Sequence, residues 1–179
     1  MWESPAVVLI SGIMAAGKST VGEALARRLP RAVHLRGDVF RSMIVGGRAE
    51  MTAAPTDEAW RQLRLRYDLA ASTADRYAAA GFTVVLQDVV LGAELPAMIG
   101  RIRHRPLAVV VLAPRPEVVA ARERDRPKNG YGDWPVADLD AGFRADTPRL
   151  GLWLDTSDQT PEETVTEILA RAWTEGQIG

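Results

Sequence analysis

Three short apolar runs stand out along the chain, at residues 6–10, 82–87 and 107–113, with the sequences AVVLI, FTVVLQ and LAVVVLA. They are rich in valine and lack the alternation of apolar and polar positions that a half-exposed strand shows. Strands that are covered on both faces of a parallel sheet have this pattern. We therefore expect three buried parallel strands, and weaker runs at 32–36 and 150–155 predict two more.

Amphipathic segments lie between these runs. The clearest covers residues 57–80, where Trp60, Tyr67 and several alanines recur every three or four positions, and Gly81 follows as a helix-ending glycine. Further helices are predicted at 18–29, 38–45, 94–103, 116–124 and 161–173. Thr160 is the expected N-cap of the last one. Strands and helices thus alternate, which predicts an α/β fold of three layers with right-handed crossovers.

Residues 122–135 interrupt the pattern. Their sequence, RERDRPKNGYGDWP, crowds charged residues together with two glycines and two prolines, a composition typical of a mobile exposed loop. No repeat or low-complexity segment divides the chain, and 179 residues suit one domain with a substantial core. We therefore expect a single domain over residues 1–179.

The composition narrows the classes of function. Apolar residues make up 47%, charged residues 25%, and the formal net charge is −1, so no electrostatic attraction to nucleic acid or to an anionic membrane is expected. The absence of cysteine excludes disulfides, thiolate metal ligands and a cysteine nucleophile. The apolar run at 6–10 is too short for a signal peptide or a membrane span. We therefore expect a cytoplasmic protein without a nucleic-acid or membrane partner.

A phosphate-binding loop follows the first apolar run. Residues 12–19, GIMAAGKS, match the pattern G-x-x-x-x-G-K-[ST] at every fixed position, with a strand before them and a helix after them. In such a loop, backbone N–H groups and the helix N-terminus face the phosphates. Lys18 would reach the β- and γ-phosphates, and Ser19 would bind Mg²⁺. The expected nucleotide-binding residues here are Gly12, Ala15, Ala16, Gly17, Lys18, Ser19 and Thr20.

Other nucleotide-binding classes fit less well. A dinucleotide-binding loop needs a glycine at position 14, where this chain has Met14. A GTPase would need an Asn-Lys-x-Asp segment for guanine, which the sequence lacks, and large ATPase machines need a longer chain. A kinase for a small molecule and an ATP-binding regulatory switch both remain.

Two aspartates are expected at the carboxyl edge of the sheet, beside the phosphate loop. Asp38 follows the second predicted strand and could accept the proton of an acceptor hydroxyl, or it could simply cap the next helix. Asp88 ends the strand at 82–87 and could hold Mg²⁺ directly or through water, or it could be a turn residue.

Arginines supply candidate cationic groups for phosphoryl transfer. Arg122 and Arg126 are four residues apart and share a helix face, so they could close over the nucleotide as a lid and neutralise the transferred group. The alternative is a solvated helix end on which Glu123 and Asp125 are local partners. Arg41, one turn after Asp38, could pair with an anionic group of the substrate.

The segments SGIMAAGKST, RGDVFRSM, VVLQDVVLG, VVAARERDR and LWLDTS together resemble the chloramphenicol phosphotransferase-like kinases. These are related to the shikimate, gluconate and nucleoside-monophosphate kinases and to the zeta-toxin kinases. The resemblance implies a five-stranded parallel sheet of order 2-3-1-4-5, ATP and Mg²⁺ as cofactors, and an arginine lid at about residues 122–135. It implies Asp38 as catalytic base, and LDTSDQTP, with Thr156, as the loop that borders adenine.

The sequence thus predicts an ATP-dependent phosphotransferase that acts on a hydroxyl of a small molecule. Asp38, Lys18, Arg122 and Arg126 are the expected catalytic residues, and Ser19 and Asp88 the expected metal ligands. An antibiotic, a sugar or a nucleoside fits as acceptor, and antibiotic resistance would be one role. A regulatory switch and a zeta-toxin-like nucleotide-sugar kinase are the alternatives. The oligomeric state has no signature in the sequence.

Overall fold

A five-stranded parallel sheet forms the centre of the protein. The computed structural model describes residues 5–125 and 135–179. The parallel strands follow the order β2-β3-β1-β4-β5, as the family resemblance implied, and a short sixth strand pairs antiparallel with β4. The strands are β1 (Val7–Ser11), β2 (Ala32–Arg36), β3 (Thr83–Gln87), β4 (Leu107–Leu112), β5 (Leu152–Leu154) and β6 (Gln177–Ile178). Because β6 has two residues, its sequence holds no periodic pattern from which it could be predicted.

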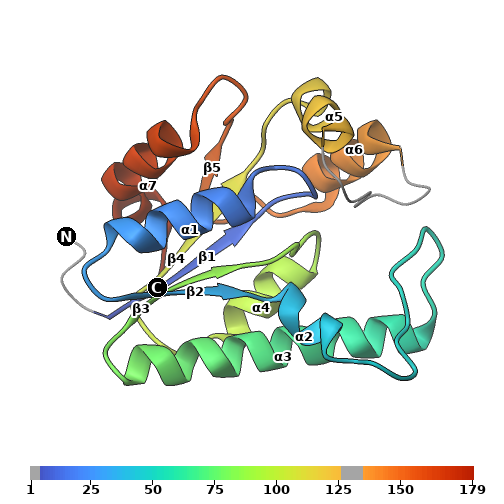
Figure 1. Cartoon of the computed structure of the whole chain (residues 1–179), viewed down its shortest axis with the longest axis horizontal. Helices are drawn as coiled ribbons and strands as arrows, with labels where there is room; N and C mark the ends of the chain where they lie inside the picture. The colour runs from blue at the N-terminus through green and yellow to red at the C-terminus, as the bar shows by residue number, and fades with distance from the viewer. Residues whose placement is uncertain (1–4, 126–134) are drawn as a thin grey trace.

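Helices cover both faces of the sheet, which confirms the expected three-layer α/β fold. Figure 1 shows α1 and α7 over one face, and α3 and α4 over the other. The helices are α1 (Lys18–Arg28), α2 (Asp38–Ser42), α3 (Asp57–Ala79), α4 (Glu94–Arg101), α5 (Pro116–Arg124), α6 (Val136–Asp146) and α7 (Pro161–Glu175). None of the helices in the described part of the chain is long and apolar enough to cross a lipid bilayer.

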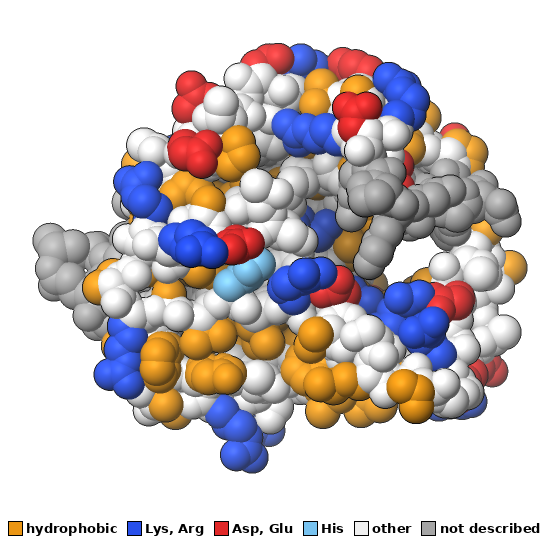
Figure 2. All heavy atoms as spheres, in the orientation of Figure 1, with side chains coloured by type: hydrophobic (Ala, Val, Ile, Leu, Met, Phe, Trp, Pro, Cys, Tyr) orange, Lys and Arg blue, Asp and Glu red, His pale blue; other side chains and the backbone are white. Residues whose placement is uncertain are grey.

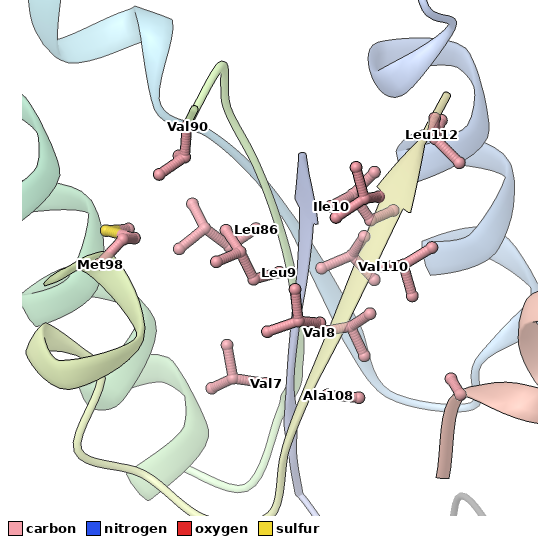
Figure 3. Packing of buried hydrophobic residues seen from close by; sticks show 14 of the residues in the cluster. Val7, Val8, Leu9, Ile10, Leu86, Val90, Met98, Ala108, Val110 and Leu112 are labelled. Atoms are coloured by element: carbon pink, nitrogen blue, oxygen red, sulfur yellow. The ribbon is translucent and has the colours of Figure 1, made fainter. Parts of the chain in front are cut away.

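The core lies where the two helical layers meet the central strands. Every residue of β1, β3 and β4 is buried, which explains why these strands lack an alternating pattern. Figure 3 shows Leu9 and Leu86 on neighbouring strands near Met98 of α4, and Val8 near Val110. The central strands are therefore fixed by packing on both faces, and the loops at their ends have a rigid support.

Capping residues set the ends of the long helices. The Thr160 side chain accepts a hydrogen bond of 3.2 Å from the backbone N–H of Glu163, and the Glu163 carboxylate accepts one from the Thr160 N–H, so α7 begins with a full capping box. The chain leaves α3 through Gly81, whose positive φ of 87° lets its N–H reach the carbonyl of Ala78. Both ends lie where the sequence predicted them.

The ends of α1, α4 and α7 lie within one or two residues of the prediction, and two other helices differ more from it. α2 ends at Ser42 instead of Val45, because the Ile44 N–H bonds the carbonyl of Arg41 in a tighter turn and two glycines follow at 46 and 47. α6 was not predicted at all. Its Phe143 is buried and stacks on Trp153 with ring centroids 5.1 Å apart, so tertiary packing stabilises it.

Candidate active site

The phosphate loop, residues 12–19, joins β1 to α1 at the carboxyl edge of the sheet. Gly12 has φ of 142°, and a Cβ there would lie 2.5 Å from the carbonyl oxygen of Leu112 on β4. Gly17 and Ala15 also have positive φ, of 98° and 58°. These positions let the backbone turn back on itself, which is how such a loop presents successive N–H groups to an anion.

Lys18 folds back over this loop. Its side chain is largely buried, and its Nζ donates a hydrogen bond of 2.7 Å to the carbonyl of Ile13. The ammonium group is therefore held above the loop by the loop's own backbone. In this place it can contact phosphate oxygens that the loop N–H groups bind.

A cavity of about 670 Å³ opens above the loop. It brings together nearly all the residues that the sequence singled out, although they come from distant parts of the chain. Its predicted site residues are Ala15, Ala16, Gly17, Lys18, Ser19, Thr20, Asp38, Asp88, Arg122 and Thr156. Gly12 shapes the loop without lining the cavity, and Arg126 lies outside the described residues.

Asp38 enters the cavity from the first residue of α2. Gly37 is the N-cap of that helix, so Asp38 is not the capping residue that the alternative interpretation required. Its side chain is 51% exposed, and its Oδ2 accepts a hydrogen bond of 3.0 Å from Nη2 of Arg36. An accessible carboxylate beside the phosphate loop is placed to meet an acceptor hydroxyl.

Asp88 is buried and bound to an arginine that the sequence analysis missed. Nε of Arg66, on α3, donates to its Oδ2 over 2.8 Å, Nη2 of Arg66 donates to its Oδ1, and the Val89 N–H donates to Oδ1 over 2.7 Å. The Asp88 side chain is 1% exposed and that of Arg66 13%. Burial lowers the pKa of the Arg66 guanidinium, and the charges of Tyr67 and Asp38 offset part of this effect.

Ser19 and Asp88, the two expected Mg²⁺ ligands, have different surroundings. Mg²⁺ in nucleotide sites is held by one or two protein oxygens together with phosphate oxygens and water. The Ser19 hydroxyl lines the cavity and suits this role. The Asp88 carboxylate already takes three hydrogen bonds, two of them from Arg66. Among the described residues there is no group of three or more His, Cys, Asp or Glu that could hold a metal ion by itself.

Arg122, on α5, joins the phosphate loop to the loop after β5. Its Nη2 donates over 3.0 Å to the carbonyl of Thr156, and its Nη1 lies 3.4 Å from the carbonyl of Ala16. Thr156 lines the cavity, and its buried hydroxyl has no hydrogen-bond partner within the described structure. A buried polar group without a partner is costly, so a ligand group that bonds it would be stabilised there.

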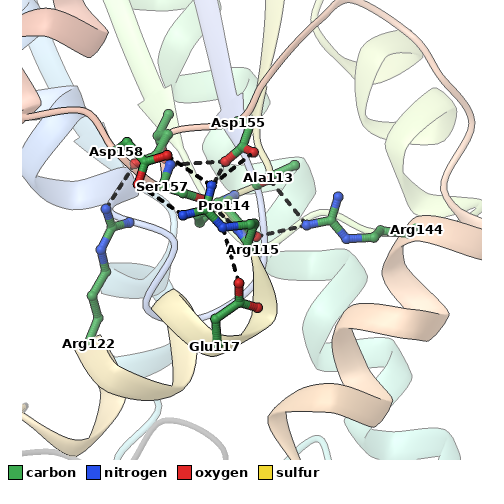
Figure 4. Close-up of polar contacts among 10 residues, drawn as sticks. Ala113, Pro114, Arg115, Glu117, Arg122, Arg144, Asp155, Ser157 and Asp158 are labelled. Atoms are coloured by element: carbon green, nitrogen blue, oxygen red, sulfur yellow. Dashed lines mark hydrogen bonds and ion pairs between the residues drawn. The ribbon is translucent and has the colours of Figure 1, made fainter.

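A second arginine fixes the same loop from outside. Figure 4 shows Arg115 between Asp155, Asp158 and Glu117. Nη1 and Nη2 of Arg115 each donate over 2.9 Å to the Asp158 carboxylate, and its backbone N–H donates to the Ser157 hydroxyl over 2.7 Å. The loop that borders one end of the cavity is therefore anchored to the end of β4.

Arg41, the expected partner of a substrate anion, already contacts a carboxylate of the chain. It forms an ion pair with Glu50, whose pKa is held below its ordinary value by the hydrogen bond from Arg41 and also by the charge of Arg48. The expected pairing of Arg41 with a substrate anion would have to compete with this carboxylate.

A larger hollow, of about 830 Å³, lies between α3 and α4 and contains no residue of the phosphate loop. The carboxylate of Asp75 there accepts the backbone N–H groups of Arg103 and His104 just after α4 ends. These polar groups serve the helix end, so we place the functional site in the smaller cavity.

Comparisons with known proteins agree with this fold. Solved structures with a similar fold include an APS kinase of Mycobacterium tuberculosis in complex with AMPPNP and APS (TM-score 0.69, 18% identity, 93% of this chain and 96% of that one). A sugar kinase from Janibacter sp. HTCC2649 has a TM-score of 0.68 at 18% identity, with 93% of each chain covered. The tunicamycin resistance protein of Deinococcus radiodurans has a TM-score of 0.65 at 18% identity over 99% of each chain.

No curated protein sequence matches this chain. A family model described as AAA domain matches residues 7–145, which include the phosphate loop, Asp38, Asp88 and Arg122. The chain therefore belongs to this AAA-domain family and has the fold of P-loop kinases.

Proposed function

We propose that this protein is an ATP-dependent phosphotransferase that transfers the γ-phosphate to a hydroxyl of a small molecule. The observation that carries the proposal is that Asp38 and Lys18 line one cavity. A group that can accept a proton thus lies in the same space as a phosphate-binding lysine. A regulatory switch needs the phosphate-binding lysine but has no use for a group that accepts a proton.

The residues divide the work of phosphoryl transfer between them. Asp38 accepts the proton of the acceptor hydroxyl as its oxygen attacks the γ-phosphorus. The bond from that phosphorus to the β,γ-bridging oxygen breaks and ADP leaves, and Lys18 stabilises the charge on the phosphate oxygens. Arg122 holds the phosphate loop against the Thr156 loop, so it keeps the nucleotide-binding parts in register. Ser19, together with phosphate oxygens, would hold Mg²⁺, which would supply further neutralising charge. Asp88 orients the backbone beside this site through its bonds to Arg66 and Val89.

The choice of ATP rests on the phosphate loop and on the structural neighbours. The APS kinase that shares this fold holds AMPPNP, an ATP analogue, together with its acceptor. The buried Thr156 hydroxyl and the anchored loop around it offer a place for the base of the nucleotide. A kinase with a nucleotide-sugar acceptor, as in the zeta-toxin kinases, would use the same catalytic base, Asp38, and would bind ATP with the same phosphate loop.

The substitution Asp38→Asn tests the proposal. It keeps the size of the side chain and removes its ability to take a proton. With an acceptor that the unchanged protein phosphorylates, turnover should therefore fall by about 10² to 10⁴. ATP binding, measured by calorimetry, should stay within about twofold. Acceptors would first be found by screening metabolites and antibiotics for phosphorylated product by mass spectrometry.

Asp57→Asn is the matched control, because Asp57 is also the first residue of a helix but does not line the cavity. Its turnover should equal that of the unchanged protein. Equal turnover in Asp38→Asn would remove Asp38 from the mechanism. Nucleotide binding without phosphorylated product from any acceptor would favour the regulatory switch.

A further inference from the structure

An apolar groove adjoins the cavity on the side of Asp38. It has a volume of about 180 Å³ and is formed mainly by hydrophobic side chains of α2, α3 and the segment between them, including Phe40, Met43, Ile44, Met51, Leu65 and Leu69. Arg41 and Arg66 line both the groove and the cavity. The two spaces therefore lie side by side with these two side chains as a shared wall, and we call the smaller one the apolar groove.

Several of these side chains face solvent. Met43 is 68% exposed and Leu65 is 50% exposed, and Met51 and Leu69 are also exposed. Figure 2 shows hydrophobic side chains gathered over α3 and the neighbouring α2. Clustered exposed apolar residues on a globular protein commonly mark a binding surface, whereas scattered single ones need no explanation.

The polar groups of the groove are already bonded within the chain. Among the described residues that line it, three carry a polar side chain. Arg41 pairs with Glu50, and Arg66 pairs with Asp88. Gln62 donates to the carbonyl of Gly47 and to Glu58, and accepts the N–H of Ala49. The positive charge of each arginine is thus already balanced by a carboxylate, which weakens the attraction for an anionic occupant, while an uncharged apolar occupant needs no counter-charge.

We propose that the acceptor of this kinase is an uncharged alcohol whose apolar part, one ring or a short alkyl chain, occupies the apolar groove while its hydroxyl faces Asp38. This rests on the proposed function. The size follows from the volume, since an apolar cavity of about 150 Å³ is enough to take up benzene. The charge follows from the ion pairs that hold Arg41 and Arg66.

Binding can be measured without turnover. Met43 and Met51 line the groove, whereas Met98 is buried in the core, so the signals of ¹³C-labelled methionine methyl groups separate the two regions. Benzyl alcohol should shift the Met43 and Met51 signals in a saturable way and leave that of Met98 unchanged. Benzoate, which has the same ring and a carboxylate, should bind at least about tenfold more weakly.

Leu65→Glu places a charge in the groove at an exposed position of α3, where folding tolerates it. It should abolish the benzyl alcohol shifts. With an acceptor that is phosphorylated, it should raise the KM of the acceptor at least about tenfold and leave the KM of ATP unchanged. Val45→Glu is the control, because Val45 is 99% exposed and does not line the groove. It should behave like the unchanged protein.

The outcomes separate this inference from the proposed function. If an anionic acceptor is phosphorylated with the highest kcat/KM, the kinase stands and the uncharged acceptor is wrong. The inference is also overturned if benzyl alcohol leaves the Met43 and Met51 signals unmoved, or if Leu65→Glu and Val45→Glu have equal effects. Signals that shift only with protein concentration would overturn it as well, and would assign the groove to a second copy of the chain. If no acceptor takes phosphate, the kinase proposal fails, and with it the assignment of the groove to an acceptor.

Discussion

The ion pair between Arg66 and Asp88 is the most consequential contact at the scale of single residues. Both side chains are largely removed from water, so each depends on the other for its charge to be tolerated. The position of Asp88 could be predicted, because the acid directly follows a buried strand. Its partner was missed because 22 residues separate the two, although Arg66 lies four residues before the buried Ala70 and therefore on the covered face of α3.

Removing one member of this pair should destabilise the protein strongly. Arg66→Met leaves a buried carboxylate without its counter-charge and should lower the free energy of unfolding by about 3–5 kcal/mol. The double substitution Arg66→Met with Asp88→Leu removes both charges and should recover most of that loss. Urea unfolding of the two single variants and the double variant measures the coupling. A double variant no more stable than either single one would show that the pair is not coupled in this way.

At the scale of elements, the loop between β5 and α7 shows how local and distant signals combine. The sequence Thr160-Pro161 with Glu163 specifies the start of α7 locally, and the structure forms that cap. The attachment of the preceding loop to Arg115 and Arg122 depends on elements that are distant in the chain. The boundary was therefore predictable, and the anchoring was not.

The cap itself can be tested. Thr160→Ala removes the side-chain oxygen that accepts the Glu163 N–H, which should cost about 0.5–2 kcal/mol of stability. Thr166→Ala is a suitable comparison, because Thr166 lies inside the same helix and is exposed, and among the described residues its hydroxyl bonds only the carbonyl of Glu162. That variant should be as stable as the unchanged protein or slightly more so. Equal losses in the two variants, measured by thermal unfolding, would speak against the cap.

At the scale of the whole molecule, the parallel sheet is what assembles the site. Because β1, β2 and β3 run in the same direction, the residues that follow them meet at one edge. This is why α/β alternation and motif positions were enough to predict that Lys18, Asp38 and Asp88 would line one cavity. The particular side chains that form the apolar groove could not be predicted in this way, because those of α2, α3 and the segment between them meet only in the folded chain.

Nucleotide binding should be visible as a change in overall stability. At a concentration about 100 times its Kd, ATP with Mg²⁺ should add about 2.7 kcal/mol to the free energy of unfolding, since only the folded protein holds the site. Removing Mg²⁺ with EDTA should reduce this gain, because the phosphates then lose a neutralising charge. The substitution Lys18→Met should reduce the gain in the free energy of unfolding more than the removal of Mg²⁺ does. Thermal unfolding with and without each component gives the comparison, and an equal gain in Lys18→Met would place the nucleotide elsewhere.

The close contact between Gly37 and Asp88 predicts which positions should vary together among related proteins. A Cβ built on this residue would overlap with Oδ2 of Asp88, and its N–H bonds the carbonyl of Gln87. The residue before the proposed base is thus pressed against the acid that Arg66 holds. Across relatives, positions 37, 66 and 88 should change together: a chain with a side chain at 37 should lack the acid at 88 and then have no need of the arginine. This three-position signature would distinguish relatives that have this site geometry from proteins that share only the phosphate loop.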